Sequence, residues 1–321
     1  MQALYKQLRY ELKRFGAEEK SIETLFIGGG TPSCVPSALY KEIFTLLAPY
    51  MQENAEITSE ANPNSASKEW LEGMYELGVN RISFGVQSFN EKKLKLLGRA
   101  HTPQQAKNAL QNAYDTGYKN LSLDLIYGVA GDTKELLHAD IEEAFSLPIN
   151  HLSAYALSIE ENTPFARKPQ LSKEDIQTTR ELFAQITKHG FAQYEISNFG
   201  TYQSRHNLGY WEYKEYIGAG SGAVGMHANT RLYPTPNIEA YIDNPLQIAK
   251  EPLSFEDIKF EKIFLGLRSR VGIEKELLNQ KERIQAEILI EEGKMSQNAT
   301  RYFNKDFLLA DALALFLTDF K

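Results

Sequence analysis

Short apolar, β-branched segments alternate with amphipathic stretches along the first half of the chain. Five such segments are typical of buried strands, and they cover residues 24–27, 56–60, 81–86, 121–126 and 152–157. Their spacing of about 25 to 40 residues suits repeated strand–helix units. The stretches between them place apolar residues at helical intervals. The pattern therefore predicts an α/β fold around a parallel sheet.

The first helix has no strand before it. Leu4, Leu8, Leu12 and Phe15 recur at helical spacing and predict a helix at the start of the chain. Five strand–helix units behind such a helix predict a partial (β/α)6 barrel that lacks its first strand. A barrel of this kind leaves one edge of its sheet unpaired, and we expect that edge to be exposed.

The pattern changes after about residue 171. Ile176, Leu182 and Ile186 predict an amphipathic helix, and residues 194–196 are strand-like. A region rich in Tyr and Gly follows, and the last part of the chain is helical in pattern. We therefore expect a partial barrel, an extension of that barrel and a small C-terminal helical domain, covering residues 1–170, 171–252 and 253–321.

Composition narrows the classes of function. The 321 residues include 35 Lys and Arg against 42 Asp and Glu, a net charge of −7 without long runs of either sign. This balance argues against nucleic acid as a partner, because nucleic-acid binding needs a basic surface. No apolar stretch approaches the roughly 20 residues of a transmembrane helix. The single cysteine excludes a disulfide framework and is typical of a reducing cytoplasm, where we place the protein.

Polar residues follow the predicted strands at their carboxyl ends. Gly28 to Gly30 and Thr31 offer backbone donors and a hydroxyl after the first strand. Later strand ends add two carboxylates, an amide and a forked cation, at Glu60, Asp124, Gln87 and Arg99. Parallel strands open on one face of a barrel, so these groups are expected to converge on one ligand. Each of them alone would be an ordinary turn or surface residue.

Five short segments resemble the radical S-adenosylmethionine (SAM) superfamily, in the same order along the chain. They read Gly28-Gly-Gly-Thr-Pro, Glu60-Ala-Asn-Pro, Gly85-Val-Gln-Ser-Phe, Leu97-Gly-Arg-Ala-His and Asp124-Leu-Ile-Tyr-Gly. The resemblance covers nearly the whole chain from residue 2 and implies SAM as a cofactor. It implies that Gly29, Gly30 and Thr31 hold the methionine end. It further implies that the carboxylate and ribose are surrounded by Glu60, Gln87, Arg99 and Asp124, and that Ile126 lies near the adenine.

Residues 205–211, Arg-His-Asn-Leu-Gly-Tyr-Trp, resemble the His-Asn-x-x-Tyr-Trp motif of the HemW-type heme chaperones. An imidazole is a natural axial ligand of heme iron, and Tyr and Trp offer flat apolar surface to a porphyrin. The resemblance implies that His206, Tyr210 and Trp211 bind heme, which is then passed to heme-accepting proteins. A packed or surface histidine is the alternative interpretation of His206. Peripheral contact with a membrane stays open.

Two other functions compete with the chaperone. HemW-type proteins are related to oxygen-independent coproporphyrinogen III dehydrogenase, an enzyme of porphyrin biosynthesis that oxidatively decarboxylates its substrate. The motif at residues 206–211 favours the chaperone, as does the lack of the extra N-terminal segment expected of the dehydrogenase. The net charge disfavours a radical SAM enzyme that modifies nucleic acid. The sequence leaves open whether the chain is an enzyme.

One element of the superfamily is missing. Radical SAM proteins hold a 4Fe–4S cluster on a Cys-x-x-x-Cys-x-x-Cys loop, whereas Cys34 is the single cysteine of this chain. No residue here is therefore assigned as a metal ligand. We expect Met1 to be an internal or misassigned start, with a strand and the cysteine loop encoded upstream; a family member that has no cluster is the alternative. Cys34 itself is predicted to be a small buried residue.

Two further features are expected to be structural. The glycine-rich run at residues 218–225 superficially resembles a dinucleotide-binding loop, but it follows aromatic residues instead of a clear strand. A turn is the better interpretation of this run. The remaining histidines lack metal-site spacing and are interpreted as structural or solvated; they are His101, His138, His151, His189 and His227.

Overall fold

Two compact units make up the part of the chain that the structure describes. The computed structural model describes residues 1–159, 164–173 and 175–318. One unit, here called the barrel unit, comprises residues 24–41 and 55–203. The other, called the second unit, comprises residues 1–23 and 42–54 and the chain from Ser204 onward. The three-part division expected from the sequence stays a prediction.

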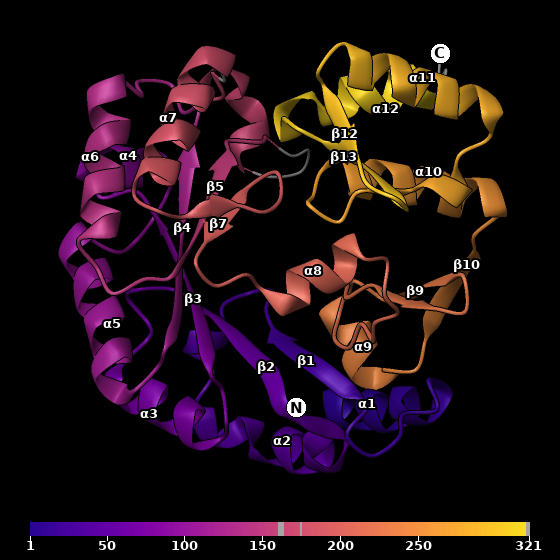
Figure 1. The fold of residues 1–321 in the computed structure, drawn as a ribbon. Helices are drawn as coiled ribbons and strands as arrows, with labels where there is room; N and C mark the ends of the chain where they lie inside the picture. The colour runs from indigo at the N-terminus through magenta and orange to yellow at the C-terminus, as the bar shows by residue number, and fades with distance from the viewer. Residues whose placement is uncertain (160–163, 174, 319–321) are drawn as a thin grey trace. The chain divides into compact units, whose positions relative to one another are not determined.

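Seven strands form one sheet in the order β1-β2-β3-β4-β5-β7-β6 (Figure 1). Their bounds are β1 Ile22–Ile27, β2 Met51–Ala61, β3 Arg81–Gln87, β4 Asn120–Tyr127, β5 His151–Ala156, β6 Ala192–Gln193 and β7 Asn198–Gly200. Strands β2 to β5 pair in parallel, and β7 pairs antiparallel with both β5 and β6. Within the described residues β1 has one neighbour in the sheet, so the expected exposed edge is confirmed.

Helices cover one face of this sheet, as Figure 1 shows for α5 and α6 beside β3 and β4. The helices of the barrel unit are α3 Lys68–Glu76, α4 Glu91–Leu96, α5 Pro103–Thr116, α6 Lys134–Phe145 and α7 Ile176–Lys188. Side chains alternate between the faces of a strand, and on β3 the residues Ile82, Phe84 and Val86 are fully buried. The other face carries Ser83 and Gln87, so the inner face of the half-barrel is polar.

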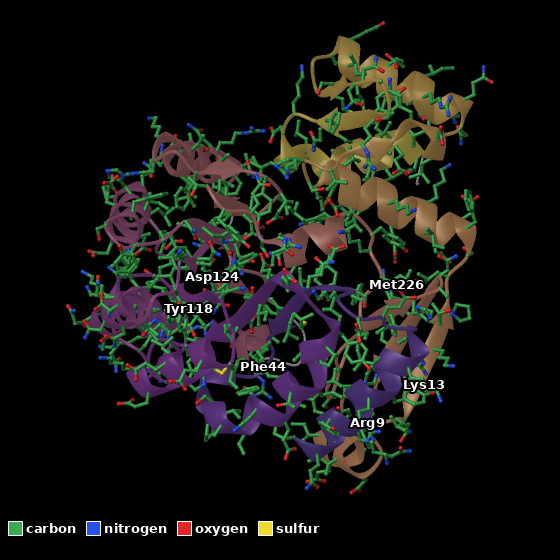
Figure 2. All side chains as sticks on the ribbon, turned by 60° about the horizontal axis from the view of Figure 1, so that its bottom comes forward. Arg9, Lys13, Phe44, Tyr118, Asp124 and Met226 are labelled. Atoms are coloured by element: carbon green, nitrogen blue, oxygen red, sulfur yellow. The ribbon has the colours of Figure 1, made fainter. Side chains whose placement is uncertain are left out.

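The layer between helices and sheet is fastened by a buried tyrosine. Tyr118, labelled in Figure 2, stands just before β4 and is 1% exposed. Its hydroxyl donates a hydrogen bond of 2.9 Å to the carbonyl of Leu71 on α3. The same burial, reinforced by nearby Tyr75, raises the pKa of the Tyr118 phenol, which therefore stays neutral. The hydrogen bond therefore connects the amino end of β4 to α3.

Three local expectations are wrong. The strand expected at residues 194–196 is a turn between β6 and β7, closed by a hydrogen bond of 3.1 Å from Tyr194 N–H to the Asn198 carbonyl. Ile176 is 52% exposed, because it is the first residue of α7 and precedes the stripe that packs. Cys34 is exposed instead of buried, since Pro32 and Ser33 are the residues of its short 3₁₀ helix that face the interior.

The second unit combines helices with a small antiparallel sheet. Its elements before residue 253 are α1 Gln2–Arg14, α2 Lys41–Leu47, α8 Arg205–Trp211, β8 Gly225–His227, β9 Thr230–Pro234, α9 Ile238–Asp243 and β10 Ile248–Pro252. The sheet order is β10-β9-β8. The glycine-rich run before β8 folds back on itself, because a Cβ at Gly218 would stand 2.1 Å from the Val224 carbonyl oxygen. This geometry agrees with a turn.

The C-terminal part of the second unit has its own apolar core. Its elements are α10 Phe255–Leu267, β11 Ile273–Glu274, α11 Gln280–Glu291, β12 Met295–Gln297, β13 Arg301–Asn304 and α12 Ala310–Thr318. Ile263, Leu289 and Leu317 from the three helices are buried together with Met295 and Tyr302. The expected helices are confirmed, and the structure adds a three-stranded antiparallel sheet in the order β11-β13-β12.

Candidate functional site

A cavity of about 200 Å³ opens at the carboxyl ends of the strands of the barrel unit. It brings together most of the residues predicted to contact SAM, namely Gly30, Thr31, Glu60, Gln87, Arg99 and Asp124. Gly29 adjoins them, because its N–H donates a hydrogen bond of 3.1 Å to Glu60 Oε2. Ile126 is outside the lining, although it shares a face of β4 with Asp124, which Figure 2 labels.

The cavity also includes residues that the sequence analysis missed. Pro32, Ala61, Asn62, Ser83 and Gly85 complete its lining. The Asn62 side-chain amide donates to Thr31 Oγ1 at 3.3 Å, and Ser83 Oγ donates to Asp124 Oδ1 at 3.5 Å. Asn62 lies in the same short motif as Glu60, and Ser83 alternates with Gly85 and Gln87. The position of Asn62 in its motif and the alternation of Ser83 along β3 could therefore have predicted both residues.

The glycine loop after β1 leaves open space at the rim of the cavity. Gly29 and Gly30 have φ angles of +76° and +29°, a region that favours glycine. A Cβ at either residue would meet no atom within 4 Å, whereas one at Gly28 would stand 2.5 Å from the Phe26 ring. The loop thus packs tightly at its base and exposes its backbone at its tip. A ligand could approach the backbone of Gly30 closely, while the Gly29 N–H donates to Glu60.

Three charged groups share the cavity at half-buried positions. Burial raises the pKa of Glu60, and the neighbouring Asp124 raises it further. The pKa of Asp124 is also raised by burial, against hydrogen bonds from Ser153 and Ser83 and the charges of Arg81 and Arg99. Burial lowers the pKa of Arg99, with Asp124 acting in the opposite direction. Two carboxyls against one lining guanidinium favour a ligand that brings positive charge together with one carboxylate.

Gln87 is held in a strained conformation. Its φ angle is +70°, which non-glycine residues rarely adopt. Gly85 makes room for its amide, because a Cβ at Gly85 would stand 3.0 Å from Gln87 Nε2 and 3.4 Å from Asn62 Oδ1. Two amide side chains therefore meet at the wall of the cavity. Strain of this kind persists only where surrounding contacts hold it in place.

A buried polar layer lies below the cavity. His151 Nδ1 is 2.7 Å from Ser122 Oγ and 3.3 Å from an Arg81 guanidinium nitrogen, and its Nε2 is 2.7 Å from the Tyr194 hydroxyl. Burial, followed by the charge of Arg81, lowers the pKa of His151 well below its usual value. The imidazole is therefore neutral, and its role is structural, as the sequence indicated.

A buried carboxyl group, that of Glu195, lies in the turn between β6 and β7. Glu195 is 1% exposed, and burial raises its pKa to about 7. Its Oε2 accepts a hydrogen bond of 3.2 Å from Ser197 N–H. Within the described chain, Glu195 Oε1 and the nearby Asn198 Oδ1 are both buried without a hydrogen-bond donor. Burial outweighs the hydrogen bonds from Ser197, Asn198 and Ile196 that lower the pKa, so the carboxyl keeps its proton up to about pH 7.

Replacing Glu195 by glutamine should change how stability depends on pH. Between about pH 4.5 and 7 the unfolded chain releases this proton while the folded chain keeps it, so wild-type stability falls as pH rises. The loss is about 3 kcal/mol, and a neutral glutamine avoids it. We expect urea unfolding at pH 5 and pH 7.5 to show the Glu195→Gln protein gaining on wild type at the higher pH. Parallel pH profiles would refute the assignment; Glu76→Gln, on the exposed face of α3, is the control.

The residues predicted to contact heme lie in the second unit, on or beside one short helix. His206 and Tyr210 occupy one face of α8, with His206 Nε2 3.1 Å from the Tyr210 hydroxyl. Tyr210 is 39% exposed and packs edge-to-face on Tyr216, with ring centroids 4.7 Å apart. Trp211 comes five positions after His206 and therefore points to a different side of the helix. The helix brings two of the three predicted residues together.

A chain of polar contacts supports this aromatic pair. The Tyr216 hydroxyl accepts a hydrogen bond of 2.8 Å from Arg231 Nη1. Arg231 Nη2 is also paired with Glu261 at 2.6 Å, and Glu261 accepts a further hydrogen bond from Tyr213 at 2.5 Å. These residues come from β9, α10 and the segment after α8. The Tyr216 ring is thereby fixed, and it in turn orients Tyr210.

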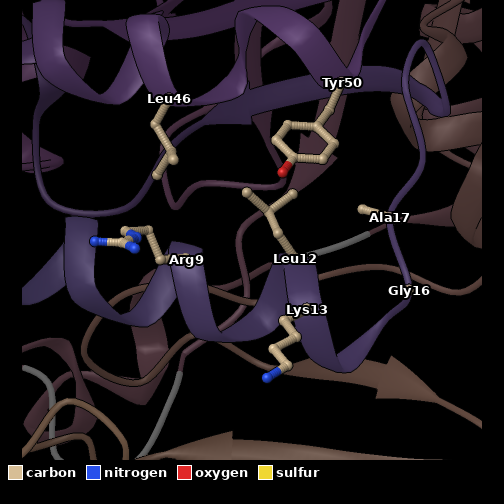
Figure 3. A pocket seen from close by; sticks show the side chains of 7 residues that line it. All are labelled: Arg9, Leu12, Lys13, Gly16, Ala17, Leu46 and Tyr50. Atoms are coloured by element: carbon tan, nitrogen blue, oxygen red, sulfur yellow. The ribbon is translucent and has the colours of Figure 1, made fainter.

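A larger cavity of about 460 Å³ lies elsewhere in the second unit (Figure 3). It is lined by Arg9, Leu12, Lys13, Gly16, Ala17, Leu46 and Tyr50. Figure 3 shows Leu12 pointing toward Tyr50, while Lys13 points away from them. This cavity includes none of the residues with predicted chemistry, and it carries no functional assignment.

Comparison with known proteins identifies the family. Residues 4–144 match the radical SAM superfamily. The heme chaperone HemW of Lactococcus lactis is 32% identical over 316 residues, which cover 94% of this chain and 82% of that protein. HemW of Bacillus subtilis is 33% identical over 281 residues, covering 82% of this chain and 74% of that protein. The chain belongs to the HemW family.

The fold of the chain is also that of a solved radical SAM enzyme. The radical SAM enzyme coproporphyrinogen III oxidase, HemN, of Escherichia coli superposes with a TM-score of 0.81. The superposition covers 100% of this chain and 82% of that enzyme, at 19% identity. At this identity the match confirms the fold, a radical SAM barrel with helices on one face of a parallel sheet. Among the described residues, no helix has both the length and the apolar character needed to cross a membrane.

The two cofactors of the radical SAM superfamily fit this chain differently. The barrel-unit cavity offers an open glycine loop, two carboxyls, two amides and a guanidinium, which suit the amino, carboxylate and ribose groups of SAM. A 4Fe–4S cluster needs three cysteine thiolates, and Cys34 is the single cysteine. The described residues contain no group of three His, Cys, Asp or Glu side chains that could hold a metal ion. The residues present fit SAM and do not fit the cluster.

Proposed function

We propose that this member of the HemW family binds heme and transfers it to heme-accepting proteins. The observation that carries the proposal is the similarity, at 32 and 33% identity, to proteins named heme chaperones. The pairing of His206 with Tyr210 on one face of α8 supports it. We further propose that the protein works in the cytoplasm and that it contacts a membrane only peripherally, if at all, during transfer.

In this proposal His206 contacts the heme most directly. Its Nε2 is engaged by the Tyr210 hydroxyl in the described structure, so ligation of the iron through Nε2 would release that hydrogen bond. Tyr210 would then turn its partly exposed ring and hydroxyl toward the porphyrin. Trp211 would add apolar surface from another side of the helix. His206 therefore sets the ligation, and the two aromatic residues add area and orientation.

We also propose that the cavity of the barrel unit binds SAM. Gly29, Gly30 and Thr31 would hold its methionine end, and Arg99 would pair with its carboxylate. Glu60, Gln87 and Asp124 would accept from its amino group and ribose hydroxyls, with Ile126 near the adenine. SAM brings a positively charged sulfonium and an ammonium, which complement the two half-buried carboxyls.

Heme transfer from the purified chain tests the proposed function. We expect the chain to bind heme with a defined Soret band, and an apo-heme protein added in excess to acquire that heme faster than from free heme. Absorbance after separation of the two proteins measures the transfer. Failure to bind heme would overturn the proposal. Decarboxylation of coproporphyrinogen III by a version whose N-terminal cysteine loop has been restored, tested with an anaerobic reductant and SAM, would replace it with the dehydrogenase function.

A further inference from the structure

A buried ion cluster lies next to the proposed SAM cavity without touching it. Lys93, on α4, is 4% exposed, which is unusual for a lysine. Its Nζ lies 2.8 Å from Asp132 Oδ1 and 3.8 Å from Asp140 Oδ2. The side chains of the two aspartates are 8% and 5% exposed. None of the three residues lines the cavity, so the cluster needs another explanation.

Asp140 fixes the turn that follows the strained residue Gln87. From α6 its carboxylate accepts the single Ser88 hydroxyl hydrogen, with Ser88 Oγ 2.7 Å from Oδ2 and 3.0 Å from Oδ1, and a second hydrogen bond of 2.7 Å from Phe89 N–H. The Ser88 N–H also donates to the Val86 carbonyl at 2.9 Å, which tightens the turn. Gln87, at φ +70°, lies inside this clamp. Removing the clamp would free Gln87 to relax to an ordinary conformation.

Asp132 connects the same lysine to the loop after β4. That loop follows the strand on which Asp124 stands, and Asp132 Oδ2 accepts a hydrogen bond of 3.0 Å from Val129 N–H. Lys93 thus joins the turn after β3 to the loop after β4. Lys93 also lies in the middle of the segment from Gln87 to Arg99. Both end residues of this segment line the cavity.

A stabilising role alone does not account for the cluster. Two aspartates and one lysine taken out of water cost desolvation energy, and apolar residues of similar size often stabilise a fold equally well or better. The three charged side chains instead hold the turn after β3 and the loop after β4 in one geometry. Arg99 depends on the same segment, because its N–H donates to the Leu94 carbonyl at 2.9 Å just after α4.

We propose that Lys93, clamped by Asp132 and Asp140, is a positioning residue that holds Gln87 and Arg99 in place for the ligand of the barrel-unit cavity. This inference rests on the proposed SAM site. Lys93 acts through the turn at Ser88 and Phe89, and it makes no contact with the ligand itself.

The first measurement is independent of SAM. Hydrogen exchange followed by mass spectrometry should show faster exchange at residues 87–90 in the Lys93→Met protein than in wild type. The matched control is Lys107→Met, which removes a partly exposed pair of 2.7 Å with Glu143 between α5 and α6. That control should leave exchange at residues 87–90 unchanged. Unchanged exchange in Lys93→Met would overturn the proposal.

The second measurement is SAM affinity by calorimetry in a double-mutant cycle. We expect Lys93→Met to weaken SAM binding about tenfold in the wild-type background and by a smaller factor in the Arg99→Ala background, because part of its effect passes through Arg99. Equal losses in both backgrounds would overturn the positioning role. Lys107→Met should leave affinity unchanged.

A further variant covers the case in which Lys93→Met does not fold. Asp132→Asn keeps an oxygen for Val129 N–H and removes the negative charge that faces Lys93, so it should show both effects to a smaller extent. If wild type binds no SAM, the proposed SAM site fails. The exchange measurement then still decides whether Lys93 holds the turn, so the two failures are distinguishable.

Discussion

Replacing Asp124 by alanine is expected to weaken SAM binding by about 1.5 to 3 kcal/mol, the scale of a hydrogen bond to a charged group. Asp124 is half-buried on β4 among Ser83, Ser153 and Arg99, so its carboxylate is already directed and needs little reorganisation to accept from a ligand. Arg99→Ala should have an effect of similar size, because it removes the guanidinium that would pair with the SAM carboxylate. Calorimetry measures both.

The controls separate loss of a contact from loss of the fold. Asp124→Asn keeps the size of the side chain and one acceptor oxygen, and it should lose less affinity than Asp124→Ala. Heme binding should survive all three changes, because His206 belongs to the second unit. SAM affinity that stays unchanged in both Asp124→Ala and Arg99→Ala would remove these residues from the site.

Anaerobic reconstitution of the 321-residue chain with iron and sulfide is expected to load no 4Fe–4S cluster. A cluster that leaves one iron free for SAM takes three thiolates, and this chain offers only Cys34. That thiol is exposed, at the end of a short 3₁₀ helix after the glycine loop. Assays of protein-bound iron and sulfide measure the loading.

Cys34→Ser is the matched control for this experiment. It should give the same background of iron and sulfide as wild type, because one thiolate adds little. Stoichiometric loading of four irons per monomer of wild type would contradict the prediction. Release of 5′-deoxyadenosine from SAM should be absent for the same reason.

Much of the site could be predicted from the sequence because strand alternation and motif position carry the information. Glu60 and Asp124 stand at the ends of apolar strands, and parallel strands bring their carboxyl ends to one edge. Ser83 could have been predicted in the same way, because it alternates with Gly85 and Gln87 on one face of β3. The pairing of His206 with Tyr210 follows from their spacing of four residues on a helix.

Other features depend on contacts between distant segments. The residues between Gln87 and Leu96 give no sign that Lys93 is buried, because the charged sequence around it is typical of a solvated helix. Its burial depends on Asp132 and Asp140, far along the chain. The small C-terminal sheet has strands of two to four residues, too short for a periodic pattern to appear.

The turn at residues 194–197 shows how burial can imitate a strand. Residues 194–196, Tyr-Glu-Ile, alternate as a buried strand would. Tyr194 and Glu195 are in fact buried, at 1% exposure each. The backbone of this segment nevertheless turns between β6 and β7, with Tyr194 N–H bonded to the Asn198 carbonyl. The residue types here indicate that the segment is buried. They do not indicate the turn, which depends on the antiparallel pairing of β7 with β5.

Heme transfer by the His206→Ala protein tests the central claim most directly. The matched control is His138→Ala, which removes an exposed histidine on α6, and Trp211→Ala reports the contribution of apolar surface. The account predicts that His206→Ala alters the Soret band of the heme complex or abolishes transfer to an apo-heme protein, that Trp211→Ala weakens heme retention without changing the band, and that His138→Ala matches wild type. A His206→Ala protein with wild-type spectrum, affinity and transfer would contradict it.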